Sequence, residues 1–269
     1  MKKRFDDIII VSDIDGTFLG SDPSAARKNI EAVKYFKENG GRFTVATGRI
    51  YMHVISALGE DDRDLCNAPM TIANGARICS PDGEELSTVY MDTDALVRHA
   101  RYIRDNFPTL GMRCSTSDGI VTDKVFGLIA KDVKVFAGGR VEVKEIEDWR
   151  DERIFKLVVR GEAGDLERLK DAALPMLEKD FYCTSSSTRF FEVNAMGCTK
   201  ARGIKYLREC YPNAKIYAVG DYGNDIEMMK AADVAACPSG ALDDVKNICD
   251  LKLCSCDDGA IAYLIERFL

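Results

Sequence analysis

The sequence predicts an α/β fold, in which a Rossmann-like parallel sheet core carries an inserted α+β cap domain. Three observations lead to this prediction. Short, β-branched apolar runs alternate with helical segments near both ends of the chain. The middle of the chain instead contains strands in which apolar and polar residues alternate. The chain has 269 residues, which is long enough for two domains.

The first part of the chain contains three predicted strands and two predicted helices. Residues 7–12 form a continuous, β-branched apolar run, the pattern of a parallel strand that is buried on both faces. Residues 43–46 and 70–73 resemble it. The segments 24–39 and 51–58 have helical spacing of their apolar residues. This alternation predicts the first half of a parallel sheet.

The same alternation returns near the end of the chain. The predicted strands are 215–219, 234–236 and 251–253, and the predicted helices are 201–210, 225–231 and 259–268. Both ends of the chain are therefore expected to contribute to one sheet.

The middle of the chain is different. Helices are predicted at 94–107 and 164–179. Segments 153–159 and 190–193 alternate apolar and polar residues, as half-exposed antiparallel strands do. We therefore expect a discontinuous core formed by residues 1–80 and 189–269, with residues 81–188 inserted as a second domain.

Composition excludes several classes of function. The net charge of −7 leaves no broad basic field for nucleic acid or an anionic membrane. No apolar run is long enough to cross a bilayer and no secretory signal is evident, so we expect a cytoplasmic protein. The ten cysteines include no C-x-x-C pair and are expected to be reduced. His53 and His99 fit no nucleophile or metal pattern, which disfavours Ser-His-Asp and histidine-rich zinc chemistry.

Two acidic residues, Asp13 and Asp15, directly follow the first predicted strand. Ligands bind at the carboxyl ends of strands in open α/β sheets. Two carboxylates this close are costly unless they share a cation or a proton. The alternatives are a solvated turn and a calcium loop. An EF-hand loop would need a glutamate at its twelfth position, where Ser24 stands, and flanking helices.

A second acidic cluster, Asp221, Asn224 and Asp225, follows the predicted strand 215–219. Together with Asp13 it could complete an oxygen-rich site of the kind that binds Mg²⁺. The alternative is that Asn224 and Asp225 simply begin the next helix. Two such loops in one sheet favour the metal site.

Two further segments suggest phosphate binding. Thr47, Gly48 and Arg49 follow the second predicted strand, where a hydroxyl and exposed amides can hold phosphate oxygens. A helix cap is the alternative there. Lys200 begins a predicted helix, where its charge opposes the helix dipole unless an anion compensates it. An exposed lysine is the alternative.

Taken in order, Asp13-x-Asp15-Gly-Thr17, Thr47-Gly-Arg49, Lys200 and Gly220-Asp221-x-x-Asn224-Asp225 resemble the four motifs of the haloacid dehalogenase (HAD) superfamily. The long insertion, preceded by Asn74-Gly75-Ala76, resembles the Cof-like branch of capped phosphatases. This resemblance implies a Mg²⁺-dependent phosphatase that acts on a small phosphorylated metabolite, with sugar phosphates as the first choice.

The resemblance also implies roles for individual residues. Asp13 would be the nucleophile that forms an aspartyl-phosphate, and Asp15 the general acid. Thr47, Gly48, Arg49, Asn74, Lys200 and Asn224 would contact the phosphoryl group or the substrate. Mg²⁺ would be held by Asp13, the Asp15 backbone carbonyl and Asp221, with Asp225 in support. The segment of the inserted domain near Arg189 is a candidate for a substrate contact.

Two alternative functions stay open at this point. One is a phosphomutase of the same superfamily, and the other is a non-catalytic metabolite-binding protein on the same fold. Asp15 favours phosphate chemistry over dehalogenation, because a dehalogenase has no leaving oxygen to protonate.

Overall fold

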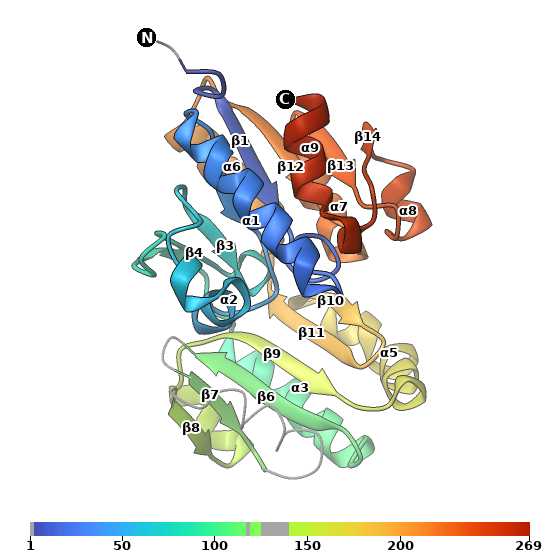
Figure 1. Ribbon diagram of the computed structural model, residues 1–269. Coiled ribbons are helices and arrows are strands. Elements are labelled where there is room, and N and C mark those ends of the chain that lie inside the picture. Colours follow the sequence, from blue (N-terminus) through green and yellow to red (C-terminus); the bar gives the residue numbers. More distant parts are fainter. Residues whose placement is uncertain (1–2, 117–118, 125–139) are drawn as a thin grey trace. The chain divides into compact units, whose positions relative to one another are not determined.

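The computed structural model (Figure 1) describes residues 3–116, 119–124 and 140–269. The chain forms two compact units, of which the first is discontinuous. Met1–Ser87 and Thr199–Leu269 make up the first unit, and Thr88–Cys198 the second. These limits lie 7 and 10 residues beyond the ends of the expected segments 1–80 and 81–188. The chain re-enters the first unit later than expected, because strand β11 (Phe190–Ala195) still pairs with another strand of the second unit.

The first unit is built on a five-stranded sheet with the order β14-β13-β12-β1-β2. Every neighbouring pair in it is parallel, which confirms the predicted α/β core. The strands are β1 (Ile8–Ser12), β2 (Arg42–Val45), β12 (Lys215–Val219), β13 (Val234–Cys237) and β14 (Leu251–Lys252).

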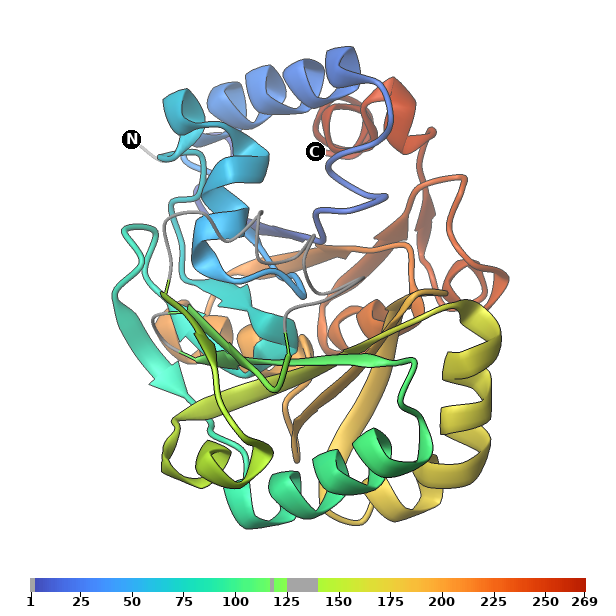
Figure 2. The same cartoon turned by 90° about the horizontal axis from the view of Figure 1, so that it is seen from below.

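Helices cover both faces of this sheet (Figure 2). Ile10 packs into the apolar cluster on one face, and its neighbours Ile9 and Val11 into the cluster on the other, as alternation along a buried parallel strand requires. Helices α1 and α9 lie on the first face and α6 and α7 on the second. Their bounds are Pro23–Glu38 (α1), Ala260–Phe268 (α9), Ala201–Cys210 (α6) and Ile226–Ala231 (α7).

A small three-stranded sheet, β3-β4-β5, completes the first unit. A parallel bridge between Ala46 and Thr71 connects β3 to the chain just beyond β2. Strands β4 and β5 were not predicted from the sequence. The remaining elements are α2 (Tyr51–Leu58), η1 (Glu60–Asp62), β3 (Met70–Ile72), η2 (Ala73–Gly75), β4 (Arg77–Cys79), β5 (Glu85–Thr88), η4 (Gly223–Asp225), α8 (Asp243–Lys246) and η5 (Cys256–Asp258).

The second unit contains a six-stranded sheet with the order β10-β11-β9-β6-β7-β8. Its pairs are antiparallel except for β7 with β8. Its strands are β6 (Gly111–Thr116), β7 (Gly119–Thr122), β8 (Arg140–Val143), β9 (Ile154–Arg160), β10 (Phe181–Ser187) and β11. Among the described residues of this unit, the helical elements are α3 (Thr93–Asn106), η3 (Ile146–Asp151) and α5 (Ala163–Leu177). The predicted α+β character of this part is confirmed.

One prediction about this sheet is wrong. Strands β9 and β11 are not half-exposed, because all but the last residue of β9 and all but the first of β11 are buried. The polar residues that produced the alternating pattern include Lys156 and Glu192. Their side chains are 4% and 7% exposed and form an ion pair, with 2.7 Å between Lys156 Nζ and Glu192 Oε1. Pairing allows both charges to be buried.

Two further features concern the chain as a whole. No helix within the described residues is both long and apolar enough to cross a membrane. All ten cysteines occur as free thiols.

Candidate active site

Asp13 lies at the carboxyl end of β1, where the parallel pairing continues for one more step. Its backbone N–H donates to the carbonyl of Val219 at the end of β12, at 2.8 Å. This bond brings the chain after β1 beside the chain after β12. The Asp13 side chain is buried there.

Lys200, the residue before α6, connects the two acidic loops. Its side chain is 1% exposed, and Nζ donates to Asp13 Oδ1 and to Asp225 Oδ1, each at 2.6 Å. Burial alone would lower the pKa of Lys200, but the carboxylates of Asp13 and Asp225 outweigh it and raise the pKa. These carboxylates compensate the cation at the start of the helix.

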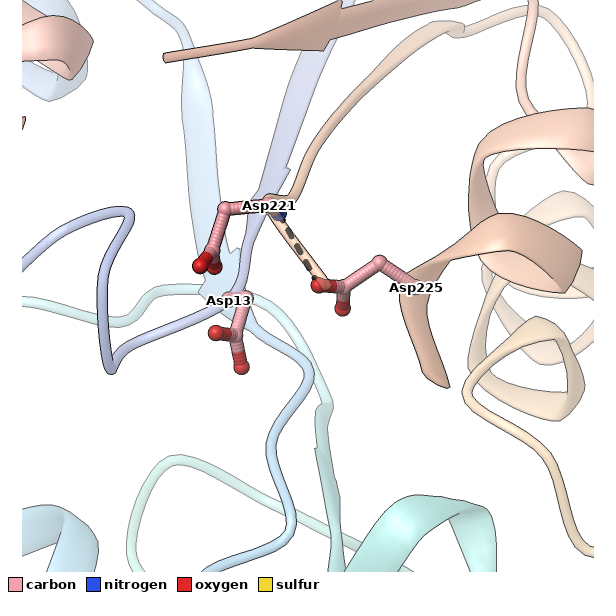
Figure 3. A group of neighbouring side chains, drawn as sticks. All are labelled: Asp13, Asp221 and Asp225. Atoms are coloured by element: carbon pink, nitrogen blue, oxygen red, sulfur yellow. Dashed lines mark hydrogen bonds between the residues drawn. The ribbon is translucent and has the colours of Figure 1, made fainter. Parts of the chain in front are cut away.

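Asp225, at the end of η4, uses both of its carboxylate oxygens. Oδ1 accepts from Lys200, and Oδ2 accepts from the backbone N–H groups of Asp221 and Tyr222 at 3.0 Å. The residue is completely buried. Asp225 therefore fixes the loop that carries Asp221 (Figure 3).

Asp221 points its carboxylate toward the Asp13 side chain (Figure 3). Its Oδ1 accepts a hydrogen bond from Thr17 Oγ1 at 2.8 Å. Gly16 allows the close approach of the two loops, since it has a φ of +84° and a Cβ at this position would lie 2.5 Å from Asp221 Oδ2. Thr17 belongs to the first motif, but its bond to Asp221 was not predicted.

The carboxylates of Asp13, Asp221 and Asp225 are suited to a divalent cation. One oxygen of each lies within 4.8 Å of the others. Three carboxylates face one ammonium group, so negative charge is in excess. Burial raises the pKa of Asp13, and the Asp225 carboxylate adds to this effect while Lys200 opposes it. Burial also raises the pKa of Asp221 to about 6. A hard cation with oxygen ligands would relieve this crowding of charge.

Asp15 lies outside this buried cluster. Its side chain is 60% exposed and forms a two-pronged ion pair with Arg49. Arg49 Nε donates to Asp15 Oδ2 at 2.8 Å, and Nη2 donates to Oδ1 at 2.6 Å. The Asp15 hydrogen bonds raise the pKa of Arg49 further, against the opposing effect of burial. This pairing of two predicted site residues was not foreseen.

The other predicted phosphate-contact residues form a second, mostly neutral group. Thr47 is buried, and its Oγ1 accepts from the Arg49 backbone N–H at 3.2 Å, across the intervening Gly48. The backbone N–H of Asn74 donates to the Thr47 carbonyl at 2.9 Å. Asn224 Nδ2 donates to Asn74 Oδ1 at 3.2 Å. The structure thus brings the loops after β2, β3 and β12 together.

Arg189 lies in the second unit, in the turn between β10 and β11. It forms an ion pair with Glu162, with 3.2 Å between Arg189 Nη2 and Glu162 Oε2. His99, which fits no nucleophile or metal pattern in the sequence, is buried on α3. Its Nε2 lies 2.8 Å from Asp180 Oδ2, and its ring packs against Phe181.

Comparison with known proteins agrees with this fold. A family model described as haloacid dehalogenase-like hydrolase matches residues 10–265. A 5-amino-6-(5-phospho-D-ribitylamino)uracil phosphatase of Bacillus subtilis is 26% identical over 97% of both chains. An HMP-PP phosphatase of Escherichia fergusonii is also 26% identical, over 81% of this chain and 78% of its own.

A crystal structure with the same fold is that of a haloacid dehalogenase-like hydrolase from Bacteroides thetaiotaomicron. It covers 97% of this chain and 99% of its own, with a TM-score of 0.81 and 21% sequence identity. The chain belongs to the haloacid dehalogenase-like hydrolase family. The resemblance to the haloacid dehalogenase superfamily that the four motifs predicted is confirmed.

Proposed function

We propose that this chain is a Mg²⁺-dependent phosphatase that transfers a phosphoryl group from a small metabolite to Asp13 and then to water. One observation carries the proposal: Lys200 bridges Asp13 and Asp225 in a buried cluster that also contains Asp221. The family and the phosphatase relatives support the enzyme class predicted from the sequence, a phosphoric monoester hydrolase.

The proposed metal ligands are two carboxylates and one backbone carbonyl. Asp13, Asp221 and the backbone carbonyl of Asp15 would hold Mg²⁺, which when bound supplies positive charge to the phosphoryl oxygens. Asp225 supports the site indirectly, because both of its oxygens are already engaged. Nothing in this assignment needs a histidine or a cysteine.

In the first chemical step, an Asp13 carboxylate oxygen attacks phosphorus and the bond from phosphorus to the leaving oxygen breaks. Asp15, which must first leave Arg49 and take up a proton from solvent, donates that proton to the leaving oxygen as the bond breaks. Lys200 and the Thr47 hydroxyl would bind the equatorial phosphoryl oxygens, and Asn224 would orient Lys200 or the substrate. The product of this step is an acyl phosphate on Asp13.

In the second step, Asp15, now a carboxylate, takes a proton from water while that water attacks phosphorus. The bond from phosphorus to Asp13 breaks, and inorganic phosphate leaves. Asp15 must exchange Arg49 for the leaving group or water to do this. The exchange is open to solvent, because the Asp15 side chain is 60% exposed and water can replace Arg49 as its partner. Arg49 is then free to contact the substrate.

The proposed substrate is a sugar phosphate or a phosphorylated sugar alcohol. One relative that matches along 97% of both chains is a phosphatase whose named substrate carries a phosphorylated ribityl group. We assign the discrimination between substrates to the second unit as a cap, with Arg189 as a candidate contact. Transfer to water rather than back to a second hydroxyl distinguishes this activity from that of a phosphomutase.

The test is phosphate release from p-nitrophenyl phosphate and from a panel of substrates, with Mg²⁺ and after its removal by EDTA. The panel contains hexose and pentose phosphates, 5-amino-6-(5-phospho-D-ribitylamino)uracil and phosphoglycolate. Asp13→Asn is compared with wild type, and Asp244→Asn is the control because Asp244 is an exposed aspartate on α8.

We expect release that requires both Mg²⁺ and Asp13 and that is unchanged in Asp244→Asn. Release that persists in Asp13→Asn would exclude Asp13 as the nucleophile. Isomerisation of hexose phosphates without free phosphate would identify a mutase instead. Binding without turnover across the panel would identify a non-catalytic protein.

A further inference from the structure

Arg202 lies in the first turn of α6, two residues after Lys200, and binds three oxygens of the first unit. Its Nη1 donates to the carbonyl of Gly75 at 2.8 Å and to the carbonyl of Ala76 at 3.2 Å. Its Nη2 donates to the hydroxyl of Ser87. All three acceptors are neutral, and they surround a half-buried guanidinium group. The geometry requires the planar, multiple donors of an arginine.

The loop that Arg202 binds has an unusual backbone. Ala73 and Asn74 have positive φ values of 49° and 55°, which residues other than glycine rarely adopt. Gly75 follows with a φ of +90°, and a Cβ there would overlap the carbonyl oxygen of Thr199. The loop therefore packs directly on the residue before Lys200. A strained backbone of this kind persists only when its surroundings hold it in place.

This loop also positions two residues of the proposed site. Asn74 Oδ1 accepts from Asn224, the residue before Asp225. The backbone N–H groups of Ala73 and Asn74 donate to the carbonyls of Arg49 and Thr47, each at 2.9 Å. A shift of the loop would thus reach the Thr47 segment and the Asn224–Asp225 segment together.

Arg202 also connects the two places where the chain crosses between units. Ser87 is the last residue of the first unit before the chain leaves it, and Thr199 is the first after the chain returns. Arg202 follows Thr199 by three residues and binds the Ser87 hydroxyl. One side chain therefore fastens both crossing segments and the strained loop within the first unit.

We propose that Arg202 is a positioning residue for phosphoryl transfer: it holds the 73–76 loop and the Ser87 crossing against the start of α6, so that Asn74, Asn224 and Lys200 keep their places. The inference rests on the proposed phosphatase function. Arg202 itself contacts none of the carboxylates of the Asp13 cluster, and its effect is transmitted through the backbone of Gly75, Ala76 and Thr199.

The experiment replaces Arg202 with alanine and adds guanidinium ion as a chemical replacement. Arg208→Ala is the matched control, since Arg208 lies on the same helix but binds Ala231 and Asp233. Turnover of p-nitrophenyl phosphate is measured well below the melting temperature. Amide hydrogen exchange is measured in peptides that cover residues 73–77 and 199–202. Sodium chloride at equal ionic strength controls for salt.

We expect Arg202→Ala to lower kcat by about tenfold or more, as misplacement of catalytic groups does. Exchange in both peptides should become faster, and guanidinium ion should restore both readouts while sodium ion does not. Arg208→Ala should change neither. Unchanged kcat and exchange in folded Arg202→Ala would overturn the proposal, as would a loss that guanidinium ion leaves unrestored.

Two further measurements keep the proposal separate from folding and from the function itself. If Arg202→Ala does not fold, Arg202→Lys decides, because one ammonium group cannot span the three acceptors. Its kcat should fall, and a wild-type value would overturn the proposal. If wild type shows no Asp13-dependent phosphate release, the proposed function fails. The hydrogen-exchange measurement then still tests whether Arg202 holds the 73–76 loop in place.

Discussion

The approach of Asp221 to the first acidic loop depends on one glycine. Gly16 leaves no room for a side chain beside the Asp221 carboxylate, and its backbone is left-handed. The Thr17 hydroxyl in turn holds Asp221 from the same loop. The position of a proposed metal ligand is therefore determined by the loop after β1 as well as by its own.

Gly16→Ala is expected to abolish most phosphatase activity and to weaken Mg²⁺ binding. The left-handed conformation costs an alanine about 1–2 kcal/mol, and the added Cβ must also displace Asp221. Gly59→Ala is the control, because Gly59 has a φ of +100° and open space around it. Both variants should lose stability by thermal unfolding, but only Gly16→Ala should lose activity. Equal activity in the two would contradict this account of the site.

The buried ion pair of Lys156 and Glu192 gives a second prediction at this scale. Lys156→Met alone leaves a buried carboxylate without its cation and should reduce stability by about 3–5 kcal/mol. The double variant Lys156→Met/Glu192→Leu should recover most of that loss, since no uncompensated charge remains. Thermal and urea unfolding measure both. Additive losses in the double variant would show that the pair is not coupled.

Among the elements, α1 and α9 are joined through Asn29. This completely buried side chain donates from Nδ2 to the carbonyl of Phe18 at 2.8 Å and accepts at Oδ1 from the N–H of Ala262 at 2.9 Å. It thereby satisfies an N–H in the first turn of α9, a helix without a side-chain N-cap of its own. The same residue holds the end of the Asp13–Phe18 loop.

Asn29→Ala is expected to lower the free energy of unfolding by about 2–4 kcal/mol, because two buried backbone groups lose their hydrogen-bond partners. Asn106→Ala is the control: Asn106 is an exposed asparagine on α3 that donates to Tyr102. The Asn106→Ala variant should lose no more than about 0.5 kcal/mol of unfolding free energy. Denaturant unfolding at equilibrium measures both. A cost below 1 kcal/mol for Asn29→Ala would contradict the joining role.

Long periodic segments could be predicted from the sequence. The helices at Tyr51–Leu58 and Ala201–Cys210 and the strand at Lys215–Val219 have the predicted bounds. Their apolar spacing determines which face is buried, so local pattern and tertiary packing agree. Short strands such as β4 and β5 could not be predicted, because segments of 3 and 4 residues are too short to show a period.

The part of the site formed by the ends of the parallel strands could also be predicted. The carboxyl ends of parallel strands meet at one edge, so Asp13 and Asp221 were expected to come together. The structure places them beside each other, with Lys200 between Asp13 and Asp225. The Asp15–Arg49 pair and the Arg202 contacts depend on how long side chains orient, which strand and helix periods do not determine. The chemical roles of all these residues stay predictions.

For the molecule as a whole, the second unit is one continuous segment, Thr88–Cys198, between two crossings. If it determines which leaving group is accepted, its exchange should change substrate preference and leave the chemistry intact. The corresponding segment of the Bacillus subtilis relative is a suitable replacement. The chimera should release phosphate with the same need for Mg²⁺ and Asp13 but with a new order of kcat/KM across the panel. An unchanged order would refute this role.

The central claim, that Asp13 carries the phosphoryl group, is tested most directly by trapping the intermediate. Wild type, Asp13→Asn and Asp15→Asn are mixed with substrate and Mg²⁺, quenched in acid, digested and analysed by mass spectrometry. We expect one added phosphoryl group on the Asp13 peptide, labile to hydroxylamine and absent from Asp13→Asn. With a leaving group that needs no acid, it should be most abundant in Asp15→Asn. A phosphoryl group on another residue, or full turnover by Asp13→Asn, would contradict the central claim.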